Sequence, residues 1–235
     1  MDHRLWRIDA LRGIAIIGMV LFHANYMLVS LFETDILDFS QVFWFFLGKT
    51  VAILFIVLAG VSLYLSLYDR SWWYIWKKTV QRTLLLGFLA MGISVVTYNF
   101  FPTERISWGI IHFFALATLL APVFLIFGRY ALAIWLMLII LPYIWTPDWQ
   151  STFLIPLGYP PSTYFSADYY PLIPWFGVYL MGYGLSHVLA RLGILETVWT
   201  LNKNRYRVLT YIGRHSLSIY MIHVPVLYVF FRIVF

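Results

Sequence analysis

The sequence contains no cysteine and few charged residues. Its 235 residues are 62% hydrophobic, 20% aromatic and only 11% charged, whereas a soluble domain is about 45–50% apolar and about 25% charged. The absence of cysteine excludes thiol catalysis, thiolate metal sites and disulfides. So few charges do not cover a globule in water, but in lipid an apolar surface faces outward without cost. The composition therefore predicts an integral membrane protein, and the length suits one compact bundle.

Seven apolar segments have roughly the length that crosses a bilayer. We expect transmembrane helices over residues 11–32, 42–68, 83–101, 108–127, 130–144, 171–192 and 216–234. The prediction is an all-α, polytopic helical bundle of about seven transmembrane helices that forms a single domain over residues 1–235.

Most basic residues lie at the span ends that are expected on one side of the membrane. With seven spans, the N-terminus and the even-numbered connections hold Arg4, Arg7, Arg12, Arg70, Lys77, Lys78, Arg82, Arg129, Arg191, Lys203, Arg205, Arg207 and Arg214. Apart from Lys49 inside the second span, only Arg105 and Arg232 do not follow this pattern. Because cytoplasmic loops are enriched in Lys and Arg, we expect the N-terminus in the cytoplasm and the C-terminus across the membrane.

The formal net charge of +6 comes mainly from the basic residues at these span ends. It does not form a basic stripe interleaved with aromatic residues, so we predict no nucleic-acid partner. No His, Asp or Glu cluster has recognisable metal-ligand spacing, and we predict no metal site.

Two connections have unusual compositions. Residues 71–82 mix tryptophan and tyrosine with lysine and arginine, which favours a helix lying at the cytoplasmic interface. The long outer segment 143–170 contains several prolines and many aromatic residues, and we expect an irregular cap folded against the bundle.

Two polar residues share one face of the first span. His23 follows Arg12 by eleven positions, so in a helix their side chains point about 20° apart and lie about 16 Å apart along the axis. Arg12, close to Asp9, is expected at the cytoplasmic interface, where it either anchors the span or binds an anion. His23 is expected at or beyond the midplane, where an ionisable group is either functional or a satisfied core histidine.

Lys49 lies within the second span, about two turns from its outer end. A charged amine there is costly unless it is paired or reached by water. Asp38 and Asp168 are the candidate partners, and a structural ion pair is the alternative to a substrate-binding role.

Several polar and aromatic residues are expected at the outer side. His112 begins the fourth span at the same level as Asp168, Tyr169, Tyr170 and Trp175. These residues either line one outward-facing pocket or, for the tyrosines and tryptophan, belong to an aromatic belt.

The last span begins with Arg214, His215 and Ser216 at the cytoplasmic edge, and His223 follows about 12 Å deeper. Arg214 and His215 either bind a ligand at this edge or meet headgroups, and Ser216 either joins them or caps the helix.

These motifs resemble the catalytic domain of heparan-alpha-glucosaminide N-acetyltransferases, relatives of wider transmembrane acyltransferases in which an Arg-x10-His motif marks the first helix. The resemblance covers nearly the whole chain. It is carried by residues 7–23, Ala59-Gly60, 108–112, 168–175 and 213–225.

The resemblance implies transfer of an acyl group, expected to be acetyl from cytoplasmic acetyl-CoA, to a sugar amine or hydroxyl or another small acceptor at the outer side. It makes His23 and His112 the expected catalytic residues. The expected donor-binding residues are Asp9, Arg12, Arg82, Arg214, His215 and Ser216. The expected acceptor-binding residues are Lys49, Asp168, Tyr169, Trp175 and His223. The family also suggests a homodimer and a multi-pass protein of a prokaryotic plasma membrane.

The chemistry fits these residue types. An imidazole with a pKa near about 6.5 takes a proton from an attacking hydroxyl or amine, or becomes acylated itself. Arginine side chains hold phosphates by charge-assisted hydrogen bonds. Two other functions stay open from the residues: a proton-coupled small-molecule transporter, motivated by Lys49, His23, His112 and His223, and a non-catalytic membrane assembly protein.

Overall fold

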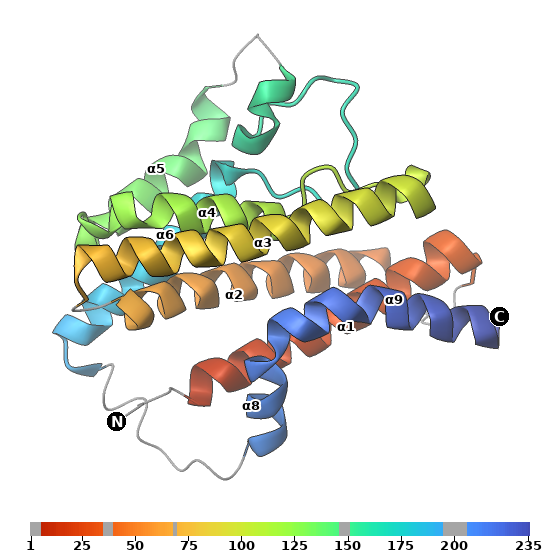
Figure 1. The fold of residues 1–235 in the computed structure, drawn as a ribbon, viewed down its shortest axis with the longest axis horizontal. Helices are drawn as coiled ribbons and strands as arrows, with labels where there is room; N and C mark the ends of the chain where they lie inside the picture. Colours follow the sequence, from red (N-terminus) through yellow and green to blue (C-terminus); the bar gives the residue numbers. More distant parts are fainter. Residues whose placement is uncertain (1–5, 35–39, 68–69, 146–150, 195–205) are drawn as a thin grey trace. The chain divides into compact units, whose positions relative to one another are not determined.

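The structure is a computed structural model that describes residues 6–34, 40–67, 70–145, 151–194 and 206–235. Within these residues the regular structure is entirely helical, as Figure 1 shows. The chain divides into two compact units, one formed by Met1–Ala59 with Leu189–Phe235 and the other by Gly60–Val188. The all-α prediction is therefore confirmed.

Eight α-helices have described bounds. They are α1 (Trp6–Phe32), α2 (Gln41–Leu67), α3 (Trp72–Phe100), α4 (Ile110–Leu125), α5 (Ala131–Ile144), α6 (Leu172–Arg191), α8 (Arg207–Arg214) and α9 (Ser216–Val234). Short 3-10 helices are η1 (Pro102–Glu104), η2 (Gly128–Tyr130) and η3 (Thr152–Leu157).

Five of these helices, α1, α2, α3, α6 and α9, are long and apolar enough to cross a membrane. The other two predicted spans correspond to the shorter apolar helices over Ile110–Leu125 and Gly128–Ile144. Each of the seven predicted spans thus coincides with an apolar helix, and the chain is an integral membrane helical bundle.

The structure differs from the sequence prediction in two connections. Residues 72–82 do not form a separate interfacial helix, because α3 runs without a break from Trp72 to Phe100. Ser71 caps this helix by accepting a hydrogen bond from the Tyr74 N–H, and no glycine or proline interrupts residues 72–83. The basic connection before the last span contains α8, an eight-residue helix that the sequence prediction missed.

In the first unit, α1 packs closely against α8 and also against α9. The close approach to α8 depends on two glycines. A Cβ added at Gly13 would collide with the carbonyl oxygen of Leu209, and one at Gly213 with the carbonyl oxygen of Asp9. Any larger residue at either position would push the two backbones apart.

In the second unit, α4 and α6 form the core. Phe113 of α4 is fully buried, and its ring contacts Tyr179 of α6. Glycines again allow close packing: a Cβ at Gly177 of α6 would lie 3.1 Å from the Trp135 carbonyl oxygen of α5. The α3 helix packs along α4, where the Thr83 hydroxyl donates to the Ala115 carbonyl oxygen at 3.3 Å.

Candidate functional site

The first unit brings two histidines into ring contact. His23 of α1 and His223 of α9 have ring centroids 4.9 Å apart with an interplanar angle of 68°. His23 is partly buried, and His223 is 6% exposed. The helix crossing thus pairs two ionisable side chains that lie two hundred residues apart in the sequence.

Backbone hydrogen bonds define which nitrogen of each ring is free. The His23 Nδ1 lies 3.0 Å from the Met19 carbonyl oxygen, and the His223 Nδ1 lies 2.7 Å from the Tyr220 carbonyl oxygen. A carbonyl oxygen only accepts, so in each neutral ring the proton is on Nδ1 and the lone pair is on Nε2. Both rings therefore have Nε2 as the basic atom.

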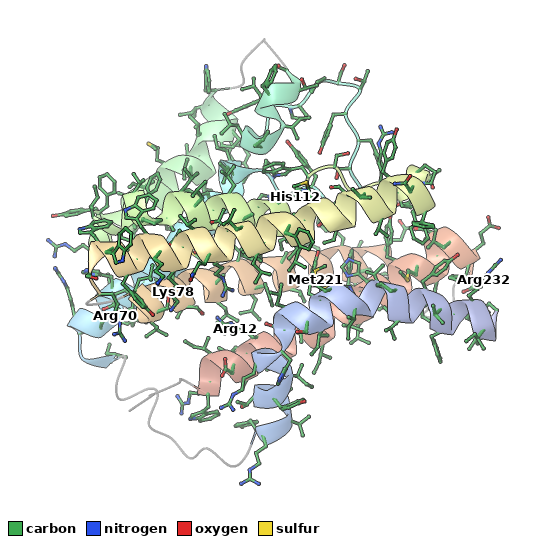
Figure 2. The ribbon with its side chains drawn as sticks, viewed as in Figure 1. Arg12, Arg70, Lys78, His112, Met221 and Arg232 are labelled. Atoms are coloured by element: carbon green, nitrogen blue, oxygen red, sulfur yellow. The ribbon has the colours of Figure 1, made fainter. Side chains whose placement is uncertain are left out.

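An ionic cluster lies nearer the start of α1, where α1 packs against α8. The carboxylate of Asp9, only 3% exposed, accepts from Arg12 and from Arg214, each at 3.3 Å. Arg12 is 23% and Arg214 46% exposed at the side chain. Figure 2 labels Arg12 on the first turns of α1. One buried carboxylate therefore holds two guanidinium groups from different helices together.

The other predicted donor-binding residues lie in three different settings. His215 lies between α8 and α9, is exposed, and donates from Nδ1 to the Tyr211 carbonyl oxygen at 2.9 Å. Ser216 is half-buried as the first residue of α9, and so does not occupy the N-cap position. Arg82 is exposed on α3 in the second unit. The ionic contacts join only Asp9, Arg12 and Arg214 of the predicted set.

His112 has hydrogen bonds at both ring nitrogens. The Gly109 N–H donates to Nδ1 at 3.1 Å, which puts the ring proton on Nε2. Nε2 lies 3.1 Å from the Ser94 hydroxyl, which itself donates to the Ile106 carbonyl oxygen. Both ring nitrogens of His112 therefore have hydrogen-bond partners, one at the start of α4 and one on α3. The catalytic role of His112 stays a prediction.

Asp168 caps the same helix. Its carboxylate accepts from the Ile110 N–H at 2.9 Å, where the positive end of the α4 dipole favours a negative charge. The neighbouring backbone is held by Ser166, whose hydroxyl accepts from the Ser107 N–H and donates to the Asp168 carbonyl oxygen. Asp168 therefore joins the segment before α6 to the start of α4.

Tyr169, Tyr170 and Trp175 lie in this segment and at the start of α6. The Tyr169 hydroxyl donates to the Ile155 carbonyl oxygen at 2.8 Å, and the Tyr170 ring lies 4.8 Å from the Trp175 ring. Burial raises the pKa of both tyrosine hydroxyls. At neutral pH both phenols are protonated, and that of Tyr169 acts as a hydrogen-bond donor.

Lys49 is exposed on α2, and its ammonium lies 5.8 Å from the Phe45 ring centroid. This distance allows a cation–π contact. The predicted partner Asp38 lies outside the described residues.

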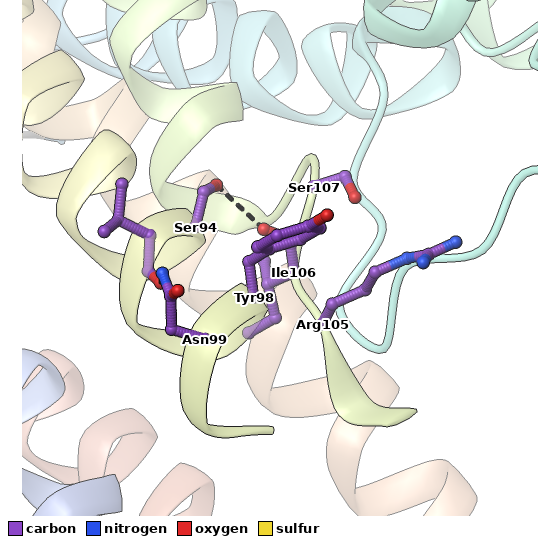
Figure 3. A pocket seen from close by; sticks show the side chains of 7 residues that line it. Ser94, Tyr98, Asn99, Arg105, Ile106 and Ser107 are labelled. Carbon is purple, nitrogen blue, oxygen red and sulfur yellow. Dashed lines mark hydrogen bonds between the residues drawn. The ribbon is translucent and has the colours of Figure 1, made fainter. Parts of the chain in front are cut away.

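A cavity of about 420 Å³ opens at the end of α3 (Figure 3). Its walls carry an aromatic ring, a carboxamide, a guanidinium and three hydroxyl groups, and none of the lining residues belongs to the predicted acceptor-binding set. The lining residues are Ser94, Val95, Tyr98, Asn99, Arg105, Ile106 and Ser107. Ser94 connects this cavity to the His112 network.

Sequence reasoning missed these cavity residues and the His23–His223 contact. Tyr98, Asn99 and Arg105 flank a span end, where tyrosine and arginine are common for reasons unrelated to ligands. The clustering of Arg105, Ser107 and Asn99 within nine residues was the available signal. The histidine contact depends on how α1 crosses α9, which no local pattern specifies.

The spanning helices of this chain are apolar, and the crossing of two of them brings two imidazole rings together. These features define a class: membrane proteins with a polar site among their helices. The chain belongs to the family of the heparan-alpha-glucosaminide N-acetyltransferase catalytic domain, whose model matches residues 4–225. This membership confirms the resemblance found in the sequence and supports a membrane acetyltransferase-type function. No curated protein and no solved structure matches the chain.

Proposed function

We propose that the chain transfers an acetyl group from acetyl-CoA, bound from the cytoplasm, to an amine or hydroxyl group of a sugar at the outer side. His23 is the general base or the acetyl-accepting nucleophile. Arg12 and Arg214 bind the phosphates of the donor. The chain acts within the lipid bilayer and uses no metal.

The observation that carries the proposal is the environment of His23. Its Nδ1–H is bound to the Met19 carbonyl oxygen, so its Nε2 lone pair is available for chemistry. A histidine inside an apolar span is costly to maintain, and α1 fixes both its orientation and its tautomer. This is the arrangement that a general base or nucleophile requires.

The donor end is supported by the Asp9 cluster. Asp9 holds Arg12 and Arg214 together, so two guanidinium groups lie on one carboxylate. Guanidinium groups bind phosphate through several N–H donors. His23 lies eleven residues from Arg12 on α1, about 16 Å along the helix, a span that suits a ligand with phosphates at one end and a thioester at the other.

The transfer itself needs no external proton source. As the acceptor attacks the thioester carbonyl, its proton moves to Nε2 of His23 and a bond forms from the acceptor to the acetyl carbon. The carbon–sulfur bond then breaks, and the leaving thiolate takes the proton back from His23. If His23 acts as nucleophile, its Nε2 bonds to the acetyl carbon as the carbon–sulfur bond breaks. The acceptor then bonds to that carbon as the bond to Nε2 breaks, and the acceptor's proton passes to the thiolate.

Within the second unit, the cavity at the end of α3 has the chemistry of a sugar-binding site. Tyr98 offers an aromatic face, and Asn99 and Arg105 offer N–H donors, which together suit a hydroxyl-bearing ring. In this proposal Asp168 and Tyr169 act on the acceptor through the segment that they position.

The decisive experiment measures CoA release from acetyl-CoA by detergent-purified protein, with glucosamine as the probe acceptor. We expect His23→Ala to abolish release while leaving expression and the thermal midpoint intact. His187→Gln changes a histidine of α6 outside the proposed site and is the matched control. Turnover that survives in His23→Ala would reject the assignment.

A thermal-shift measurement with CoA separates this function from transport and from a purely structural role. A ligand that binds only the folded state raises the midpoint. We expect CoA and acetyl-CoA to stabilise the wild-type chain. Substrate flux in liposomes without CoA binding would favour the transporter.

A further inference from the structure

The His223 side chain is buried with one polar atom unsatisfied. Its Nδ1–H donates to the Tyr220 carbonyl oxygen, but Nε2 is enclosed and has no hydrogen-bond partner among the described residues. An unsatisfied buried acceptor is destabilising, and native structures keep such groups where they serve a purpose.

The enclosure of Nε2 also argues against direct contact with the acceptor. The nitrogen is shielded from solvent, whereas an acceptor-binding group must face the space that the acceptor enters. The neighbouring ring is that of His23, with centroids 4.9 Å apart in an edge-to-face arrangement. The neighbour of His223 is thus the proposed reacting group.

His23 needs a partner only during the reaction. When its Nε2 gains the acceptor's proton or an acetyl group, the ring becomes a cation in an apolar part of the bundle. A buried cation is strongly destabilised unless a dipole or lone pair faces it. A second imidazole that is itself neutral supplies such a group without adding a charge.

We propose that His223 is a positioning residue that stays neutral and stabilises the cationic form of His23 during acetyl transfer. This inference rests on the proposed function and deepens it. The proton follows the route already described, from the acceptor to His23 and from His23 to the thiolate, and His223 neither gains nor loses one.

The test compares three substitutions in detergent-purified protein, using acetyl-CoA with glucosamine. His223→Leu removes every polar atom. His223→Gln is long enough to place an acceptor oxygen where Nε2 lies. His223→Asn has the same amide on a shorter side chain, which reaches the Tyr220 carbonyl oxygen but not the position of Nε2. Ile222→Leu, an exposed neighbour on α9, is the control.

We expect His223→Leu and His223→Asn to lower kcat by roughly 100-fold with the KM for acetyl-CoA changed less than about two-fold, a loss typical of perturbed acid–base catalysis. His223→Gln should recover about ten-fold. The proposal would be overturned if the Gln and Asn variants had equal kcat. It would also be overturned if the loss of kcat in each variant matched its fall in thermal midpoint. A raised KM for glucosamine with kcat retained would overturn it as well, because it would make His223 an acceptor contact.

Two different results would show that this inference is wrong and that the proposed function is wrong. If His23→Ala retains turnover, the proposed function fails. If His23→Ala is inactive and His223→Leu retains wild-type kcat, only the role of His223 is lost.

Discussion

Single charges matter most in one part of the proposed site, the cluster of Asp9, Arg12 and Arg214. The carboxylate of Asp9 is almost completely buried. Its ion pair with Arg12 lies within α1, and its ion pair with Arg214 joins α1 to the end of α8. Removing one partner of such a group leaves the remaining charges uncompensated. The cluster therefore combines a structural contact with a proposed donor site.

We expect Asp9→Asn to lower the thermal midpoint and to weaken CoA binding by roughly ten-fold, because both guanidinium groups lose their shared acceptor. The free energy of unfolding should fall by about 1–3 kcal/mol, less than for a fully buried pair because Arg214 is half-exposed. Thermal shift with and without CoA measures both effects. An unchanged CoA affinity in a folded Asp9→Asn protein would contradict the donor assignment.

Arg105 gives a residue-scale test of the acceptor cavity. It is an exposed cation on the cavity wall, beside Tyr98. We expect Arg105→Ala to raise the KM for glucosamine by roughly five- to ten-fold, as for loss of one hydrogen bond at an exposed position. The KM for acetyl-CoA should not change. A change confined to acetyl-CoA would move this residue to the donor site.

The sequence was sufficient to single out Arg12 and His23, because eleven helical positions return to the same face and a histidine inside an apolar span is rare. It was insufficient for the partner of His23. That contact depends on the crossing of α1 and α9. The hydrogen bonds of His112 likewise depend on Ser94 of a neighbouring helix.

At the scale of elements, the packing of α1 against α8 depends on glycine. Gly13 and Gly213 lie where the two backbones nearly touch, and each added Cβ would meet a carbonyl oxygen that has no room to move. This packing also positions the Asp9 cluster, which lies within the same contact.

We expect Gly213→Ala to unfold this contact and abolish expression of folded protein, because the collision is with backbone. Gly92→Ala is the matched control. Gly92 is also helical, its Cβ would meet nothing within 4 Å, and alanine should stabilise α3 by up to about 1 kcal/mol. Size-exclusion profiles and thermal midpoints of the two variants provide the comparison. A Gly213→Ala protein as stable as the wild type would show that α8 does not pack as described.

The segment before α6 should be sensitive to alkaline pH. Burial raises the pKa of Tyr170 above that of an unfolded tyrosine, which is about 10. Above pH about 10 the folded state therefore binds more protons than the unfolded state, so stability falls as the pH rises. Thermal midpoints between pH 8 and 11 should show this fall, and Tyr170→Phe should reduce it. Tyr143→Phe, at a strongly exposed position, should not.

Helical spans were the most predictable elements, because a long apolar run has few alternatives in lipid. The start of α3 and the presence of α8 were not predicted. Amphipathic and basic residues such as those of 72–82 suit either a separate interfacial helix or the first turns of a span, and the absence of a helix breaker decides between them. The α8 helix is short, and its stability comes from packing against α1.

At the scale of the whole molecule, function depends on orientation across the membrane. A donor bound from the cytoplasm and an acceptor bound outside require the two ends of the spans to face opposite compartments. The distribution of basic residues predicts that arrangement, with Arg129 inside and residues 143–170 outside.

The absence of native cysteine makes this orientation directly testable. Ser162→Cys and Arg129→Cys each introduce one thiol at an exposed position. In intact cells a membrane-impermeant thiol reagent should label Ser162→Cys at once, because the distribution of basic residues predicts that the segment around it faces outward. It should label Arg129→Cys only after the membrane is opened. The opposite pattern would place the proposed donor end outside the cell, where acetyl-CoA is absent. A cytoplasmic donor and the inferred direction of transfer would then both be wrong, even though the helical bundle and its paired histidines would be unchanged.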